Sequence, residues 1–325
     1  MRRQVMAKRK STTRNKPISD FTVDSVPLSF NGGIEAELLD LTDKSDAVDA
    51  SRHMVREGRF KNSFMMGTNG GSTYERMLRP SAPHPESALT GPVGQESASG
   101  GLHNLGSPNA LQLIADTSRI PARSVALLSI TPEKGPMRYG TAWLIGPRTL
   151  ATAAHNLLHP EVGATQAMLV HLAFDGHVAR GGTYRVIDNH FLSGWRQRSS
   201  DISPLDFAVI KIEDPEIGNR RGWFGFADYE DAKFNNMIVN VFGHPATRPR
   251  AAMYGSAGRV VQSDPGFLWY DCQTEGGMSG GPVIAVFGEE RIAVGIHIAG
   301  GGGSNNRGAR LNNAAYDMFM QYQSW

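Results

Sequence analysis

Cysteine is almost absent from this chain, because Cys272 is the only one among 325 residues. A single cysteine cannot form an intrachain disulfide, so the fold must be stabilised by packed cores without covalent cross-links. Cys272 lies at the end of the apolar run that begins at Phe267, which favours a packing role over a role as a catalytic nucleophile.

Long hydrophobic runs are absent as well. No apolar stretch approaches the roughly 20 residues of a membrane-spanning helix, so we expect no membrane partner. The basic start of the chain is not followed by an apolar stretch of about 7 to 15 residues, so the sequence predicts no secretory signal peptide. With 40% hydrophobic and 20% charged residues, the composition is that of a soluble globular protein.

Negative charge is missing from the start of the chain, where seven basic residues precede the first acidic residue, Asp20. This run is short and has no interleaved aromatic residues, which favours a solvated end over the alternative, a nucleic-acid-binding tail. The net charge of the whole chain is only +2. We therefore expect no nucleic-acid partner.

A serine enclosed by glycines is present near the C-terminus, where residues 274–282 read TEGGMSGGP and include Ser279. A serine hydroxyl is a poor nucleophile near pH 7, so it needs a histidine to take its proton and a carboxylate to orient that histidine. His155 ends the segment TAAH, and Asp206 opens a β-branched apolar run at 207–212. The chain order His155, Asp206, Ser279 predicts a catalytic triad.

The glycines beside Ser279 permit the tight turn that an oxyanion hole requires. An oxyanion hole needs backbone N–H groups that point to one place, which requires a tight turn without obstructing side chains. We expect the N–H groups of Gly277 and Ser279 to form this hole. A Gly-Gly-x-Ser-Gly turn by itself favours an ordinary hairpin loop, and it is the histidine and aspartate segments, in this order along the chain, that favour catalysis.

These segments carry a family resemblance. TAAH, the aspartate-led strand and Gly-x-Ser-Gly-Gly-Pro resemble the chymotrypsin-like (trypsin-fold) serine peptidases. Within them, FGHP at 242–245, the spacing from Thr274 to Ser279 and GIH at 295–297 are similar to the bacterial glutamyl endopeptidases. The resemblance covers roughly residues 115–325. It implies a serine endopeptidase acting on protein or peptide substrates without a cofactor, and an extracellular location, which the missing signal peptide leaves uncertain.

The resemblance also implies an all-β fold of two orthogonal six-stranded barrels with the site in the crevice between them. Short β-type runs in the sequence agree with this. They occupy residues 124–130, 140–145, 149–153, 168–174, 207–212, 237–242, 258–261, 267–270, 283–287 and 292–298. Within this region only the stretch 311–323 has a helical pattern, which predicts a C-terminal helix packed on the second barrel.

A substrate pocket for a glutamate side chain follows from the same resemblance. Thr274 and His297 match the family's threonine and histidine that bind the substrate carboxylate, and Ile298, Ala299 and Gly300 match the segment that pairs with the substrate backbone. A buried structural histidine is the alternative interpretation of His297. The family often has an aromatic residue and two glycines after this histidine, so the pocket wall is expected to differ here.

The first third of the chain has a different character. Its second half has few apolar runs and many turn residues, so we expect residues 1–115 to form a largely irregular pro-segment or flexible arm, and residues 116–325 to form the peptidase domain. A small helper domain with a helix at 34–39 is the alternative. We expect cleavage between about residues 95 and 123 to activate a zymogen.

No metal site is predicted, because the histidines lack metal-ligand spacing and no acidic loop resembles a calcium site. We expect a monomer. Three functional hypotheses remain from the sequence: a glutamate-preferring endopeptidase, a trypsin-fold peptidase of another specificity, and a catalytically silent binding module. The complete set of triad residues argues against the third hypothesis.

Overall fold

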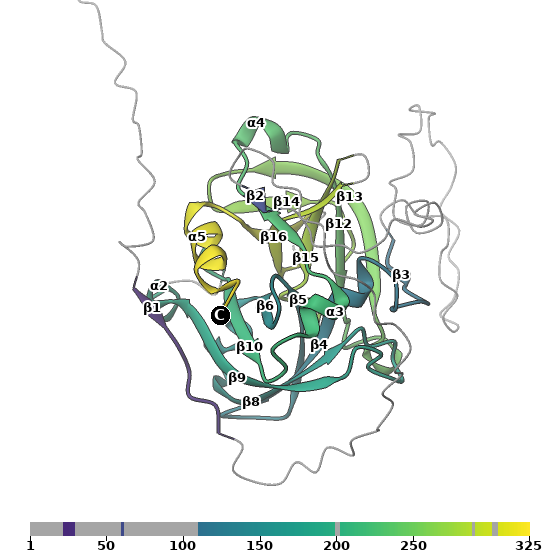
Figure 1. Cartoon of the computed structure of the whole chain (residues 1–325). Coiled ribbons are helices and arrows are strands. Elements are labelled where there is room, and N and C mark those ends of the chain that lie inside the picture. Colours follow the sequence, from purple (N-terminus) through teal and green to yellow (C-terminus); the bar gives the residue numbers. More distant parts are fainter. Residues whose placement is uncertain (1–21, 30–59, 62–109, 199–201, 288–289, 301–304) are drawn as a thin grey trace, which may run out of the picture.

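The computed structural model describes residues 22–29, 60–61, 110–198, 202–287, 290–300 and 305–325. Within these residues the chain forms two closed six-stranded antiparallel β-barrels, which lie one above the other in the view of Figure 1. The predicted all-β fold with a C-terminal helix is confirmed.

Each barrel is one continuous hydrogen-bonded sheet that closes on itself. The first closes through pairing of β8 with β9, and its strands are Val125–Pro132 (β4), Arg138–Leu144 (β5), Thr149–Thr152 (β6), Gly163–Leu172 (β8), Thr183–Leu192 (β9) and Ala208–Ile212 (β10). The second closes through β15 and β16, and its strands are Ile238–Gly243 (β12), Tyr254–Ser263 (β13), Phe267–Tyr270 (β14), Pro282–Phe287 (β15), Glu290–Ala299 (β16) and Asn306–Arg310 (β17).

Short elements surround the barrels. The additional strands are Val23–Asp24 (β1), Phe60–Lys61 (β2), Gln112–Leu113 (β3), Leu158–His159 (β7) and Gly225–Ala227 (β11). The helices are Ser193–Arg196 (α2), Ile217–Arg221 (α3), Asp231–Phe234 (α4) and Asn313–Tyr322 (α5), with 3-10 turns at Ala122–Ser124 (η2), Ala154–Asn156 (η3) and Pro249–Ala251 (η4). The sequence did not predict β9, β17 or the one-turn helices α2 to α4.

Three apolar clusters hold the barrels together. One fills the first barrel, a second fills the second barrel, and the third lies between the barrels and beneath α5. In the third cluster the ring of Trp143 from β5 packs edge-on against Phe224 and against Phe319 of α5, at centroid distances of 5.5 and 5.9 Å. The contact between the barrels therefore includes buried, edge-on aromatic rings within this apolar cluster.

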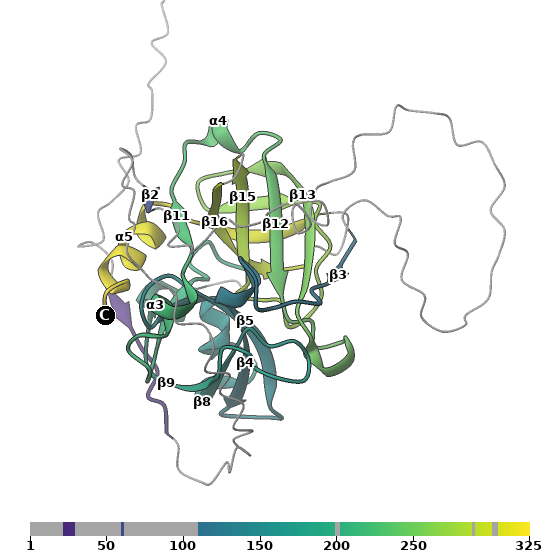
Figure 2. The same cartoon turned by 45° about the vertical axis from the view of Figure 1, so that its right-hand side comes forward.

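The C-terminal helix α5 attaches to both barrels. Asn312 caps it by accepting hydrogen bonds from the N–H groups of Ala314 and Ala315. At its other end, the Gln323 side chain donates to the carbonyl of Ile145 in the turn between β5 and β6, at 2.8 Å. Figure 2 shows α5 along the side of the two barrels.

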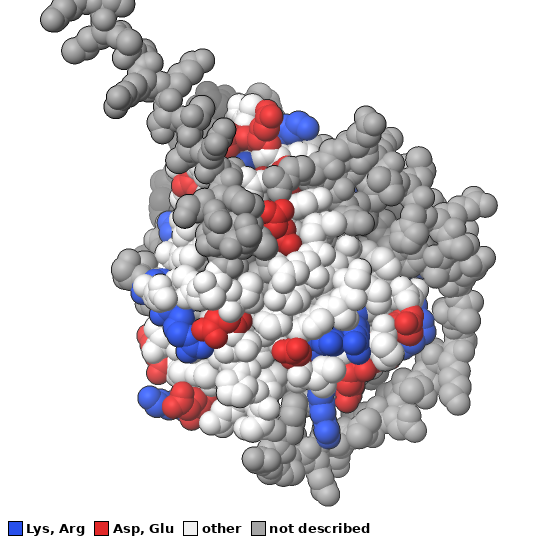
Figure 3. All heavy atoms as spheres, turned by 60° about the vertical axis from the view of Figure 1, so that its left-hand side comes forward, with Lys and Arg blue, Asp and Glu red and all other residues white. Residues whose placement is uncertain are grey.

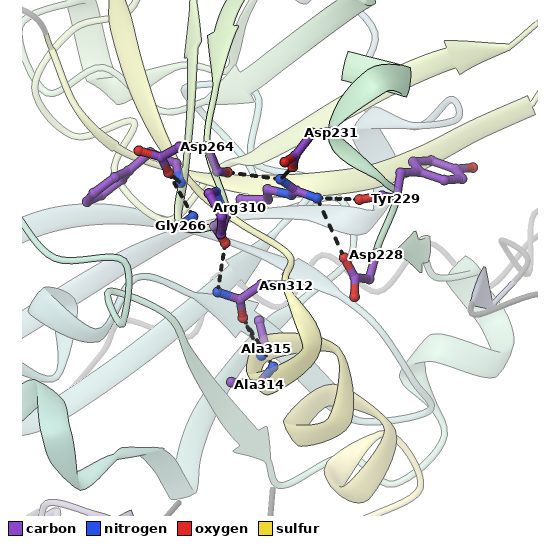
Figure 4. Close-up of polar contacts among 11 residues, drawn as sticks. Asp228, Tyr229, Asp231, Asp264, Gly266, Arg310, Asn312, Ala314 and Ala315 are labelled. Atoms are coloured by element: carbon purple, nitrogen blue, oxygen red, sulfur yellow. Dashed lines mark hydrogen bonds and ion pairs between the residues drawn. The ribbon is translucent and has the colours of Figure 1, made fainter. Parts of the chain in front are cut away.

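A buried arginine anchors the strand that precedes this helix (Figure 4). Arg310 is only 5% exposed, and its Nη1 donates to the carboxylate of Asp231 in α4 and, at 2.9 Å, to the carbonyl of Asp264 between β13 and β14. Its Nη2 donates to the carbonyl of Tyr229 and lies 4.0 Å from Oδ1 of Asp228. One guanidinium thus connects three segments on the outside of the second barrel.

Parts of the predicted N-terminal arm belong to the sheets. β1 pairs with β9 of the first barrel, and β3 pairs with β13 of the second. Ile114, directly after β3, is 3% exposed and lies in the cluster between the barrels. The proposed helper helix at 34–39 lies outside the described residues, and the division at residue 115 stays a prediction.

On the face shown in Figure 3, acidic and basic side chains of the described residues are interspersed, and neither sign forms a broad area. None of the helices in the described residues has both the length and the apolar character that crossing a membrane requires.

Candidate active site

His155 and Asp206 are brought together by the pairing of two strands. His155 lies in η3, three residues after the end of β6, and Asp206 lies two residues before the start of β10. These strands are antiparallel, with Ala208 opposite Thr152, so the aspartate lies beside the histidine. The Asp206 carboxylate, 1% exposed, accepts from Nδ1 of His155 at 2.7 Å and from the His155 backbone N–H at 2.9 Å. These two bonds offset the desolvation of a buried carboxylate and fix the orientation of the imidazole.

Ser279 comes from the other barrel, in the loop between β14 and β15. Its backbone carbonyl accepts hydrogen bonds from the Thr141 N–H at 2.8 Å and from the Asn156 side chain at 3.1 Å. Asn156 is the residue next to His155. The serine loop of the second barrel is therefore hydrogen-bonded directly to the histidine segment of the first.

The turn that holds Ser279 requires glycine at two positions. Gly277 has φ of +100° and Gly280 has φ of +92°, both in the region that favours glycine. A Cβ atom on Gly277 would lie 2.5 Å from the His244 carbonyl oxygen, and one on Gly280 would lie 2.1 Å from the Thr141 carbonyl oxygen. No side chain fits at these distances, so neither position can take another residue without movement of the backbone.

Three N–H groups of the turn 276–281 have no acceptor among the described residues, namely those of Gly276, Gly277 and Ser279. The other N–H groups of the turn are used. Those of Met278, Gly280 and Gly281 donate to the carbonyls of Glu275, His297 and Met278, at 3.1, 2.8 and 2.9 Å. The two N–H groups that the sequence assigns to the oxyanion hole are thus among those left free to bind a ligand oxygen.

Thr141 supports this turn from the first barrel, and the sequence did not identify it. Its hydroxyl donates to the Gly277 carbonyl and accepts from the His244 N–H, both at 3.0 Å. The side chain is fully buried in β5. The only sequence signal is a threonine inside the apolar run 140–145, where a buried hydroxyl needs partners that local sequence does not reveal.

His297 lies in β16, buried to 2% exposure, and its Nδ1 is 2.8 Å from the hydroxyl of Tyr270 in β14. Burial and the nearby imidazole of His155 lower the pKa of His297 to about 3, although a hydrogen bond with the Arg307 backbone acts in the opposite direction. Burial raises the pKa of Tyr270 well above its usual value. Both side chains are therefore neutral near pH 7, and the sequence did not single out Tyr270.

Thr274 lies in the loop that leads to Ser279. Its Oγ1 is buried and has no hydrogen-bond partner among the described residues. A buried hydroxyl without a partner is unfavourable, so it is suited to binding a polar ligand atom.

The segment expected to pair with substrate leaves β16. Ile298 is buried in the cluster between the barrels, Ala299 packs on the same cluster, and Gly300 follows the strand and is exposed. The register with β17 shifts between His297 and Ala299, so this end of the strand contains an irregularity. The segment is attached to the core on one side and ends at the surface.

Cys272 and Met278 belong to the apolar cluster that fills the second barrel. Cys272 is fully buried, and burial together with the charge of Asp271 raises the pKa of its thiol. The Met278 side chain is buried in the same apolar cluster. The described residues contain no group of three or more His, Cys, Asp or Glu side chains that could hold a metal ion.

Comparisons with known proteins agree with this geometry. Residues 140–296 match the family described as "Trypsin-like peptidase domain". The chain is 27% identical over 219 residues to the glutamyl endopeptidase of Bacillus licheniformis, and 28% identical over 214 residues to a Bacillus subtilis protein named extracellular metalloprotease. Each match covers 65% of this chain and 66% of the relative, so the chain spans slightly less than two thirds of their length.

A solved structure described as a Glu endopeptidase in complex with MPD has the same fold. Its TM-score is 0.57 at 23% identity, and the match covers 66% of this chain and 97% of that one. Residues 140–296 therefore match trypsin-like peptidase domains, the described residues have the chymotrypsin-like (trypsin) fold, and the chain is similar in sequence to bacterial glutamyl endopeptidases.

Proposed function

We propose that this protein is a serine endopeptidase that hydrolyses the peptide bond after glutamate, with Ser279, His155 and Asp206 as its catalytic triad. The observation that carries the proposal is the combination of the His155–Asp206 hydrogen bond with the two free N–H groups at Gly277 and Ser279. The first supplies an oriented base, and the second supplies donors for the oxyanion.

In the proposed mechanism, Nδ1–H of His155 donates to Asp206, which leaves Nε2 with a lone pair to take the proton of the Ser279 hydroxyl. The serine oxygen attacks the scissile carbonyl, and the N–H groups of Gly277 and Ser279 stabilise the negative oxygen that forms. The protonated His155 then donates its proton to the leaving amine. Water, activated by His155 in the same way, then attacks the acyl-enzyme, which releases the acyl product and restores the Ser279 hydroxyl.

The proposed glutamate preference rests on neutral donors. Because the pKa of His297 is lowered to about 3, this residue is neutral near pH 7 before substrate binds, and it offers the substrate carboxylate an N–H group in place of a resident cation. We propose that the Tyr270 hydroxyl donates to Nδ1 of His297, which places the imidazole hydrogen on Nε2, where a substrate carboxylate competes with the Arg307 backbone for it. The unpaired hydroxyl of Thr274 supplies a second donor.

Two experiments test the proposal. Ser279→Ala should reduce peptide hydrolysis by about 10⁴ to 10⁶, and a serine-reactive fluorophosphonate should label the unaltered protein but not this variant. Near-normal hydrolysis by Ser279→Ala would refute the assignment of the nucleophile. Unlabelled wild-type protein without hydrolysis would indicate a silent binding module.

Cleavage of a peptide library then tests the specificity. We expect cuts after glutamate, and we expect Thr274→Val and His297→Ala to reduce these cuts far more than they reduce fluorophosphonate labelling. A wild-type preference for lysine, arginine or a large apolar residue would contradict the glutamate assignment and leave the peptidase assignment intact.

A further inference from the structure

Residues 22–29 lie along the edge of the first barrel and pair with its sheet, although about 80 residues of chain separate them from β3. In β1, Val23 lies opposite Leu192 and Asp24 opposite Phe191 of β9. Backbone hydrogen bonds extend the contact at both ends, from the Ser193 N–H to the Thr22 carbonyl at 2.8 Å and from the Ser29 N–H to the Gln166 carbonyl at 2.7 Å.

One buried amide recognises the backbone of this segment. Asn189, 1% exposed in β9, accepts from the Val26 N–H at 3.0 Å and donates to the Val26 carbonyl at 2.8 Å. Both polar groups of that peptide residue are thereby satisfied by one side chain. If the segment left, the Asn189 amide would lose both bonds inside the protein, which is unfavourable for a buried polar group.

The side chains of the segment complete the core. Val26 is 3% exposed and lies in the apolar cluster that fills the first barrel, and Leu28 packs against the same cluster. At the rim, the Asp24 carboxylate accepts from Nε of Arg196 at 2.6 Å. The contact therefore has an apolar centre, a buried polar pair and a charged edge, as binding sites for extended peptides do.

The segment also lies close to the catalytic side of the barrel. Phe191 of β9 is opposite Asp24 on one side and opposite Ala208 of β10 on the other. Ala208 is two residues from Asp206. Residues 22–29 thus support the sheet that holds the aspartate of the proposed triad.

We propose that residues 22–29 are a permanent strand of the first barrel, which stays bound without a covalent link when the chain is cut between it and the peptidase body. The groove beside β9 is then a site for one extended peptide, whose occupant is this segment. A cut in the zone 95–123 predicted from the sequence accordingly yields a two-chain protein, and does not release the first third completely. This inference does not depend on catalytic activity.

The experiment uses the full-length chain with Ser279→Ala, which prevents self-cleavage, and a recognition site for a site-specific protease inserted between Gly32 and Gly33. After cutting, verified on a denaturing gel, native gel filtration reports whether the fragment 1–32 elutes with the body. Val26→Asp places a charge in the buried position, and Ser25→Asp places the same charge at the adjacent exposed position as a matched control.

We expect the fragment to co-elute in the unaltered and Ser25→Asp proteins, with little change in Tm on cutting. In Val26→Asp, the fragment should separate and the Tm should fall by about 5 °C or more. Separation of the fragment from the unaltered protein, or equal behaviour of the two aspartate variants, would overturn the proposal.

Discussion

Thr141→Val is expected to damage both stability and turnover, because valine keeps the shape of threonine but lacks the hydroxyl that joins the two barrels. The lost group donates to the Gly277 carbonyl and accepts from the His244 N–H. The His244 N–H is fully buried, so leaving it unpaired costs about 1 to 3 kcal/mol, and the Gly277 carbonyl is partly accessible and adds less. We expect the free energy of unfolding to fall by about 2 to 4 kcal/mol.

The effect on catalysis follows from the position of Gly277. Its carbonyl is held by Thr141, and its N–H is one of the two proposed oxyanion donors. A loosened donor is expected to lower kcat about tenfold, which corresponds to roughly 1.4 kcal/mol of transition-state stabilisation. KM should change little, because the residues of the proposed glutamate pocket are untouched.

Urea unfolding and steady-state hydrolysis of a peptide measure the two effects. Thr141→Ser is the matched control, since it keeps the hydroxyl and removes only a methyl group. A valine variant as stable and active as the wild type would contradict this prediction, and so would equal losses of stability and activity in the serine and valine variants.

Three further predictions concern buried polar groups. Arg310→Met should lower the free energy of unfolding by about 2 to 4 kcal/mol in urea, because the carbonyls of Tyr229 and Asp264 lose their donor; an unchanged midpoint would contradict this. Burial lowers the pKa values of His171 and His244 to about 4, so the unfolded chain binds protons first as the pH falls below about 6.5. Each of these histidines should then lower the free energy of unfolding by about 1.4 kcal/mol per pH unit as the pH falls from about 6.5 to about 4. His171→Asn should therefore reduce the slope of the free energy of unfolding against pH, measured between pH 7.5 and 5. Tyr270→Phe should reduce the preference for glutamate over glutamine about tenfold without loss of fluorophosphonate labelling, whereas equal loss of both would indicate only a structural role.

Local sequence was sufficient for the elements whose patterns are regular. Apolar β-branched runs predicted ten strands of the two barrels, eight of them within two residues of their observed bounds, whereas β8 and β13 begin five and four residues earlier than predicted. The apolar periodicity of 311–323 predicted α5. β9 and β17 were missed for identifiable reasons. Thr183–Leu192 mixes charged and apolar residues on a strand exposed on one side, and Asn306–Arg310 contains no large apolar residue. Both strands form because barrel closure supplies their partners.

The sequence by itself determined which residues have the chemistry of the site: a serine in a glycine turn, a histidine, and an aspartate at the start of a strand. Only the tertiary structure decided which polar groups face one another. Thr141 and Gly277 are 136 residues apart, Tyr270 and His297 are 27 apart, and Val26 and Asn189 are 163 apart. Such hydrogen bonds depend on the register of strands around closed barrels and on the packing between the barrels. Local periodicity contains no information about either, so the residues that hold the site became visible only in the folded chain.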